Sequence, residues 1–337
     1  MSAEELLAQD FGAFPDLIRA HARERPNHAA LIEGDAILTY RELAALMDRI
    51  AFALRRDGVI PGEAVAICAR ASIPYAAAFC GVLAAGAVVS PLAPSSTAAG
   101  LVMMIEDCSA KILFLDRETG EALETVSGAG RATPVALDDS AAGKSLSRWL
   151  GPEGAKPAAV GFRPDWPFNI IYSSGTTGAP KGIVQPHVMR WRQLSRVSYR
   201  DAVTLVSTPL YSNTTLVVFI PTLAHGGTAV LLPKFEAGEF LRLAERRRVT
   251  HAMLVPVQYR RIMERPDFDR YDLSSYVMKA STSAPFSAAL KAEVLNRWPG
   301  GLVEFYGMTE EEFIKIVNTK DKLTFTPDGL LLDAPSN

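Results

Sequence analysis

The chain has 337 residues, of which 48% are hydrophobic, enough for a sizeable core and for two or three domains. Its formal net charge of −2 indicates neither a nucleic-acid partner nor a membrane-surface partner. The three cysteines lie in apolar or mixed segments and the acidic N-terminus lacks a secretory pattern, which together predict a cytoplasmic protein with buried thiols.

The first half of the chain predicts helices that alternate with short apolar strands. Residues 39–58 predict a helix, because Thr39 and Glu42 have capping-box spacing and Gly58 can end the helix in a left-handed conformation. The segment 74–94 is long enough to span a membrane, but its Ala and Gly content favours a buried helix followed by a strand. Uninterrupted apolar runs predict strands covered on both faces at 63–69, 87–92, 111–116 and 168–174.

The second half repeats this alternation. Further apolar runs predict strands at 202–207, 228–232, 251–256, 276–281 and 302–307. Amphipathic segments at 236–249 and 287–298 predict helices between them, and the polar segment 119–165 is expected to be a surface excursion. Strands that alternate with helices in this way predict an α/β fold of mostly parallel sheets with helices on both faces.

One stretch, YSSGTTGAPKGIVQPH from Tyr172 to His187, concentrates hydroxyl groups, glycines and a single lysine. Glycines such as Gly182 let the backbone approach a ligand closely, including at positive φ, and Lys181 adds a mobile positive charge. This combination predicts a polyphosphate site beyond the carboxyl end of a strand, with a simple solvent loop as the alternative. It is not the common P-loop, because Pro180 and Gly182 stand where that motif requires Gly and Ser or Thr. The residues expected at the phosphates are Ser173, Ser174, Gly175, Thr176, Thr177, Gly178 and Lys181.

Several motifs in the same order resemble the adenylate-forming (AMP-binding) superfamily of acyl- and aryl-CoA synthetases, luciferases and peptide-synthetase adenylation domains. The stretch above resembles its phosphate loop, and EFYGMTE at 304–310 resembles its Tyr-Gly-x-Thr-Glu element. Residues 38–54 and 81–94 resemble an early helix and an Ala/Gly-rich helix–strand element, and residues 281–287 resemble the segment beside the adenine. The resemblance covers roughly residues 16–310 and implies the N-terminal region of an acyl- or aryl-CoA synthetase, with two mostly parallel sheets.

The resemblance also implies how the chain divides. Residues 15–58 together with 202–318 would form one α/β subdomain, and residues 59–201 would form a second that carries the phosphate loop. After Glu310 the resemblance stops, and residues 319–337 are expected to be an atypical tail. We therefore expect either a truncated form without the C-terminal lid, or a short homologue whose lid a separate chain supplies. Nucleotide and acid would then still bind weakly, while adenylation would be impaired.

The resemblance assigns chemistry to individual positions. Tyr306 would stack on the adenine, Thr309 would bond the α-phosphate, and Glu310 would hold Mg²⁺ together with Thr177. Lys181, Thr309 and Glu310 form the expected catalytic set. Besides the phosphate loop, the nucleotide would contact Ser283, Ala284, Tyr306, Gly307 and Thr309. The implied reaction is attack of a carboxylate on the α-phosphorus of ATP, followed by transfer of the acyl group to the thiol of coenzyme A.

The substrate is expected to be a small-molecule carboxylic acid, fatty or aromatic. Residues 208–227, where amino-acid-activating relatives usually place an aspartate, contain no acidic residue. Tyr211 and Ser212 stand where many relatives have Phe-His, so a substrate gate is not carried over. The expected pocket residues are Tyr211, Asn213, Val257, Ala284 and Met308, with His187 near the site. Tyr259 and Phe286 are expected in the core or pocket wall.

Two alternatives stay open: an amino-acid adenylation domain, and a non-catalytic remnant that binds nucleotide or a partner. The histidines show no zinc-ligand spacing, and the chain has no G-x-S-x-G elbow of a serine hydrolase.

Overall fold

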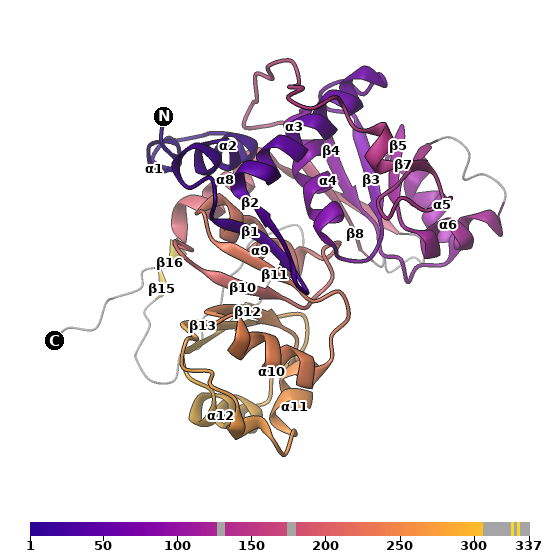
Figure 1. Ribbon diagram of the computed structural model, residues 1–337. Helices are drawn as coiled ribbons and strands as arrows, with labels where there is room; N and C mark the ends of the chain where they lie inside the picture. The colour runs from indigo at the N-terminus through magenta and orange to yellow at the C-terminus, as the bar shows by residue number, and fades with distance from the viewer. Residues whose placement is uncertain (127–131, 174–179, 306–324, 327–328, 331–337) are drawn as a thin grey trace.

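The computed structural model describes residues 1–126, 132–173, 180–305, 325–326 and 329–330, and most of their strands lie in two seven-stranded sheets (Figure 1). The first sheet has the strand order β14-β13-β12-β10-β11-β1-β2 and is parallel except for the β1–β2 pair. Its strands are β1 (Ala29–Glu33), β2 (Ala36–Thr39), β10 (Val203–Val206), β11 (Thr228–Leu231), β12 (His251–Leu254), β13 (Met278–Ser281) and β14 (Gly301–Glu304).

The second sheet has the order β7-β6-β5-β3-β4-β8-β9 and is parallel except for the β8–β9 pair. Its strands are β3 (Ala64–Cys68), β4 (Val88–Pro91), β5 (Ile112–Leu115), β6 (Thr133–Ala136), β7 (Lys144–Ser145), β8 (Pro167–Ser173) and β9 (Lys181–Pro186). A short antiparallel pair, β15 (Phe325–Thr326) and β16 (Gly329–Leu330), lies apart from both sheets. The predicted α/β fold of mostly parallel sheets is confirmed.

Most of the helices connect parallel strands of one sheet, as the alternating pattern predicts. Helix α3 begins with the predicted capping box, in which Thr39 Oγ1 accepts from the backbone N–H of Glu42, and Gly58 after its end has a φ of +84°. The helices are α1 (Ala3–Leu7), α2 (Phe14–Glu24), α3 (Tyr40–Arg56), α4 (Ile73–Ala84), α5 (Ala98–Asp107), α6 (Arg117–Glu124), α7 (Leu146–Trp149), α8 (His187–Arg196), α9 (Asn213–Ala224), α10 (Ala237–Arg246), α11 (Pro256–Met263), α12 (Ala288–Arg297) and the short 3₁₀ turn η2 (Phe268–Arg270).

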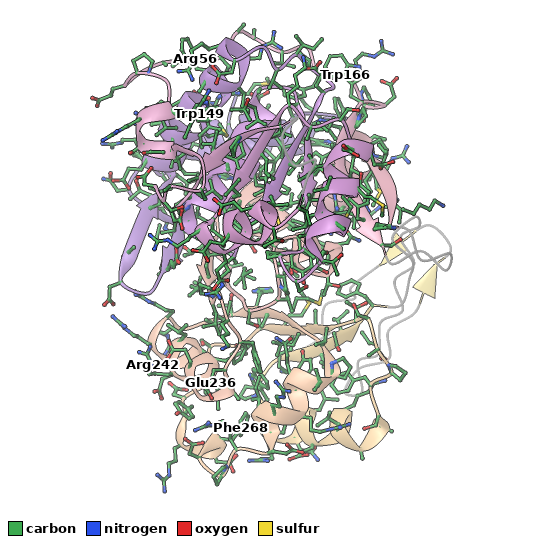
Figure 2. All side chains as sticks on the ribbon, turned by 90° about the vertical axis from the view of Figure 1, so that its right-hand side faces the viewer. Arg56, Trp149, Trp166, Glu236, Arg242 and Phe268 are labelled. Atoms are coloured by element: carbon green, nitrogen blue, oxygen red, sulfur yellow. The ribbon has the colours of Figure 1, made fainter. Side chains whose placement is uncertain are left out.

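The segment 119–165 differs from its prediction as a surface excursion. It contains β6 and β7, which extend the second sheet beyond β5, and α7 packs on the same end. Trp149 secures this segment, because its indole N–H donates to Asp57 at 2.7 Å and the guanidinium of Arg56 lies 5.8 Å from its ring centroid. Figure 2 shows Arg56 and Trp149 at one end of the molecule, and Glu236, Arg242 and Phe268 at the other.

Helix α4 lies between the two sheets, where it contacts α2, α3, β1, β3 and β4 (Figure 1). Because these elements surround it, the helix is apolar on all its faces. Its close contact with α3 depends on Gly81, where a Cβ would lie 2.5 Å from Cγ2 of Ile50. The segment 74–94 is therefore a buried helix followed by β4, as predicted. No helix in the described ranges is long and apolar enough to cross a membrane.

One hydrophobic core reaches both sheets: it contains Leu31 and Leu231 of the first and Val65 and Val89 of the second. This shared core does not separate the two sheets into independent units, so the predicted division into subdomains of residues 15–58 with 202–318 and residues 59–201 stays a prediction. Cys68 and Cys80 are buried as expected, and burial raises the pKa of both thiols to about 12, whereas Cys108 is only half-buried.

Candidate nucleotide and acid site

The two ends of the predicted phosphate loop are held by a β-hairpin. Ser173, the last residue of β8, lies opposite Lys181, the first residue of β9. Strand β8 is parallel to β4, so its last residue, Ser173, and the paired Lys181 lie at the carboxyl edge of the second sheet, where open α/β sheets bind ligands. Ser173 is half-buried and the side chain of Lys181 is exposed. Apart from Ser283 and Ala284, the other predicted nucleotide, metal and catalytic residues lie outside the described residues: Ser174, Gly175, Thr176, Thr177, Gly178, Tyr306, Gly307, Thr309 and Glu310, as does the pocket residue Met308.

Tyr172 anchors the hairpin to helix α5. Its hydroxyl donates to Oδ2 of Asp107 at 2.6 Å and to the carbonyl of Met104 at 3.1 Å, and burial together with the Asp107 carboxylate raises the pKa of the phenol. A Cβ at Gly182 would lie 3.0 Å from Cγ2 of Ile170 and 3.2 Å from the Tyr172 ring. Gly182 lies within β9 and has no positive φ. The absence of a side chain at this position therefore leaves room for Ile170 and Tyr172, and does not provide the backbone freedom expected from the sequence.

A cavity of about 420 Å³ opens at the carboxyl edge of the first sheet. Loops after four neighbouring strands, β10, β11, β12 and β13, contribute to it, together with the starts of α9 and α11. Because parallel strands place their carboxyl ends side by side, segments up to 75 positions apart along the chain meet here. Its lining residues are Thr208, Pro209, Ser212, Thr214, Phe235, Val255, Val257, Gln258, Arg261 and Ser283.

Two of the predicted ligand-contacting residues, Val257 and Ser283, line this cavity. The Ser283 hydroxyl lies 3.0 Å from Oγ1 of Thr214, which links the loop after β13 to helix α9. Ser283 has a φ of +76°, an unfavourable conformation for a residue with a side chain, and such strain is concentrated at ligand sites. Ala284, the next residue, is exposed, and Tyr211 is half-buried beside the lining residue Ser212.

His187 lies in a different environment from the one expected near a substrate. It is the first residue of α8 and is buried, with its ring centroid 5.2 Å from that of Phe162 and 5.1 Å from that of Phe168. Burial lowers the pKa of His187 to about 4, so the imidazole is neutral at pH 7. Its role at the substrate stays a prediction. Tyr259 and Phe286 are buried core residues, as expected, with ring centroids 4.9 Å apart.

A buried polar cluster beneath the start of α9 was not predicted from the sequence. Arg190 of α8 is 1% exposed and donates to Oδ1 of Asn213 at 2.6 Å, to Oδ1 of Asn169 at 3.3 Å, and to Oε1 of Gln185. Asn169 also donates to Gln185 at 2.9 Å. The predicted pocket residue Asn213 is thus positioned by Arg190. No local pattern indicates this cluster, because its members come from β8, β9, α8 and α9.

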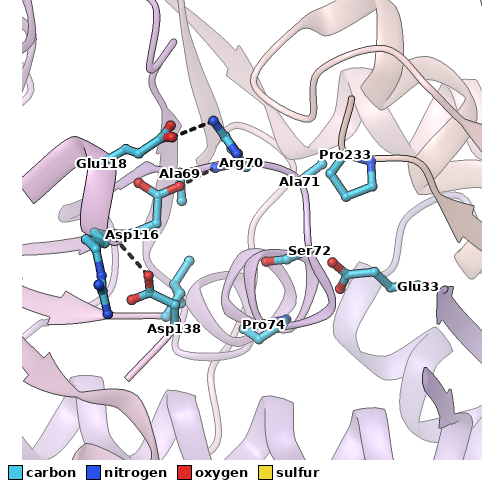
Figure 3. A pocket seen from close by; sticks show the side chains of 12 residues that line it. Glu33, Ala69, Arg70, Ala71, Ser72, Pro74, Asp116, Glu118, Asp138 and Pro233 are labelled. Carbon is cyan, nitrogen blue, oxygen red and sulfur yellow. Dashed lines mark hydrogen bonds and ion pairs between the residues drawn. The ribbon is translucent and has the colours of Figure 1, made fainter. Parts of the chain in front are cut away.

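A larger cavity, of about 530 Å³, lies at the carboxyl ends of β3, β5 and β6 (Figure 3). Its carboxylates serve as helix caps: Asp116 accepts from the N–H of Thr119 at 3.0 Å, and Glu33 accepts from the N–H of Ile73 at 2.9 Å. Arg70 and Glu118 form an ion pair across its rim at 2.5 Å (Figure 3). None of the predicted site residues lines it. Across the described ranges, no group of three or more His, Cys, Asp or Glu side chains is arranged to hold a metal ion.

Comparison with known proteins decides the family. The family model described as "AMP-binding enzyme" matches residues 18–327. This chain belongs to that family.

Relatives of this AMP-binding chain include a feruloyl-CoA synthase from Amycolatopsis sp, which is 33% identical over 318 residues, covering 90% of this chain and 60% of that protein. An indoleacetate–CoA ligase from Aromatoleum aromaticum is 30% identical over 308 residues, covering 87% of this chain and 59% of that protein. The chain therefore spans about 60% of the length of these relatives. The inhibitor-bound N-terminal domain of FACL13 from Mycobacterium tuberculosis has the same fold, with a TM-score of 0.79 at 24% identity, covering 89% of this chain and 77% of that one.

Proposed function

We propose that this AMP-binding family chain binds ATP and a carboxylic acid, activates the acid as an acyl-adenylate, and takes part in transfer of the acyl group to the thiol of coenzyme A. The family match over residues 18–327 carries this proposal. It is supported by relatives that are named as CoA synthase and CoA ligase. The placement of Ser173 and Lys181 at a sheet's carboxyl edge is a further support.

The proposed reaction brings two anions together. A bond forms between a carboxylate oxygen and the α-phosphorus, while the bond from that phosphorus to pyrophosphate breaks. The exposed ammonium of Lys181 would offset phosphate charge, and the Ser173 hydroxyl would donate to a phosphate oxygen. Thr309 and Tyr306 would bond the α-phosphate and stack on the adenine. A Mg²⁺ ion, which Glu310 and Thr177 would hold, supplies further charge neutralisation when it is bound.

The acid is proposed to be aromatic or fatty and to lack an α-ammonium group. No Asp or Glu is among the described residues that line the 420 Å³ cavity, so this lining offers no carboxylate to pair with an ammonium. Val257 of that lining, with the neighbouring Tyr211, Asn213 and Ala284, is the proposed contact with the acid, and Met308 would complete this set, whereas Ser283 stays assigned to the nucleotide.

Thermal unfolding with Mg²⁺-ATP and with non-hydrolysable acyl-adenylate mimics tests this proposal. A ligand at a hundred times its Kd adds about 2.7 kcal/mol of stability, which raises the unfolding midpoint measurably. The Lys181→Ala variant should lose much of the ATP-dependent increase. The matched control Lys156→Ala removes another exposed lysine, far from the hairpin in sequence, and should keep it. A cooperative transition that no nucleotide or mimic shifts would contradict the proposal, and a response only to aminoacyl-adenylate mimics would replace the acid class with amino acids.

A further inference from the structure

The cavity at the carboxyl edge of the first sheet contains an unbalanced positive charge. Arg261 is the one charged side chain among the ten described residues that line it. The remaining lining is hydroxyl, amide and apolar, so no carboxylate in it offsets the guanidinium. A single charge in a concave site of this kind attracts a ligand group of the opposite sign.

Two arginines that follow Arg261 along the chain already have carboxylate partners. Arg265 pairs with Asp267 at 2.8 Å, and Arg297 pairs with Asp269 at 2.9 Å. Within the part of the chain that the structure describes, Arg261 forms no ion pair and no side-chain hydrogen bond. Its donors are therefore available to a ligand.

The position of Arg261 on α11 directs it toward the cavity. Val257 and Arg261 are four residues apart, so they lie on one face of the helix, and both line the cavity. Side chains on a helix lean toward its N-terminus, and α11 begins at Pro256, immediately beyond the carboxyl end of β12. The long Arg261 side chain thus reaches back toward the strand ends that form the cavity.

The rest of the lining favours a ligand with polar substituents over a purely aliphatic one. Gln258 is 8% exposed and fixed, with Nε2 donating to the carbonyl of Ser207 at 3.3 Å and Oε1 accepting from the N–H of Val255 at 3.0 Å. The hydroxyls of Thr214 and Ser283 add donors and acceptors. Apolar contact comes from Val255, Val257, Phe235 and Pro209.

We propose that Arg261 determines specificity by binding a carboxylate at the far end of the acid substrate, so that the preferred substrate is a dicarboxylic acid. This inference rests on the proposed function, in which the other carboxylate is the one activated. A planar guanidinium can bind a carboxylate through two parallel hydrogen bonds, a geometry that a neutral substituent does not match. A phosphate of ATP or of coenzyme A has the same anionic chemistry, and the experiment separates it from the acid.

The test compares two acyl-sulfamoyl adenosine mimics of equal length, one from terephthalic acid with a distal carboxylate and one from 4-methylbenzoic acid with a distal methyl group. Binding is measured by isothermal titration calorimetry on the wild-type chain, on Arg261→Gln and on the matched control Arg260→Gln, an exposed neighbour on the same helix that does not line the cavity. We expect the wild-type chain to bind the carboxylate mimic about tenfold or more tightly than the methyl mimic. Arg261→Gln should abolish this preference, and Arg260→Gln should retain it.

Equal binding of both mimics by the wild-type chain would overturn the role of Arg261 while leaving the proposed function intact. Binding of neither mimic would contradict the proposed function itself, and the inference with it. Titration of Mg²⁺-ATP and of coenzyme A alone provides the third arm. If Arg261→Gln weakens the binding of Mg²⁺-ATP or of coenzyme A and leaves the ratio of the two mimic affinities unchanged, Arg261 binds a phosphate group. The assignment of Arg261 to the acid is then wrong. In a charge-reversed variant, Arg261→Glu, the preference should shift to a mimic with a distal amine.

Discussion

Replacing Arg190 by methionine tests whether the buried polar cluster holds the start of helix α9. Methionine keeps an apolar stem of similar length but removes every donor. Gln185 keeps the hydrogen bond that Asn169 donates to it at 2.9 Å, but Oδ1 of Asn169 and Oδ1 of Asn213 lose their Arg190 donor. Each stranded buried acceptor costs about 1–3 kcal/mol. Asn169 is fully buried and Asn213 is half-buried, so we expect a total loss of about 2–4 kcal/mol in the free energy of unfolding.

The assay is urea denaturation followed by both tryptophan fluorescence and circular dichroism, because coincident transitions justify a two-state free energy. Arg192→Met is the matched control: this arginine lies on the same helix but is exposed, and its loss should change stability by no more than about 0.5 kcal/mol. If the Arg190 and Arg192 variants unfold at the same urea concentration, the cluster contributes nothing to stability and the reasoning is refuted. Arg190→Lys should lie between the wild-type chain and the methionine variant, since one ammonium cannot reproduce the guanidinium geometry.

Three further outcomes follow from other parts of the fold. Thr39→Ala removes the capping box of α3 and should cost about 1 kcal/mol in urea denaturation, whereas Thr39→Ser should restore most of it. Because burial lowers the pKa of His187 from 6.5 to about 4, the unfolded chain binds the extra proton, so stability should fall as pH falls from 6.5 to 4. Melting curves across this range should flatten in His187→Leu, and an unchanged profile would argue against the burial effect. Gly226→Ala should destabilise the protein more than Gly34→Ala in urea denaturation. Both glycines have a positive φ, but only at Gly226 would a Cβ lie 2.8 Å from the His21 ring. Equal losses of about 1 kcal/mol in the two variants would show that this contact relaxes.

Local sequence patterns identify the inner strands and the best-capped helix. β3, β4, β5 and β12 are buried along their whole length; β3 and β5 are uninterrupted runs of apolar residues, and β4 and β12 each contain one polar residue, Ser90 and His251. Helix α3 carries its own start signal in Thr39 and its own stop signal in Gly58. The hydroxyl- and glycine-rich stretch after β8 is equally local, which is why its resemblance to an AMP-binding phosphate loop is visible without a structure.

Edge strands depend on their neighbours instead. β6 contains the sequence TPVA and β7 only Lys-Ser, and neither has a pattern that predicts a strand. They become strands because β5 offers an unpaired edge, which β6 and then β7 complete. In the same way β9 forms because it pairs back on β8 across the loop, and this pairing places Lys181 opposite Ser173.

The sequence by itself determined the family and the α/β class, and it predicts the residues at the phosphates, because each depends on short contiguous motifs. Only the tertiary structure decided that Arg190 positions Asn213, that His187 lies in an aromatic core, and that Arg261 faces the same cavity as Ser283. The physical reason is the parallel sheet itself. It places the ends of strands that are distant along the chain next to one another, so the charge and burial of each side chain there depend on segments that no local pattern connects.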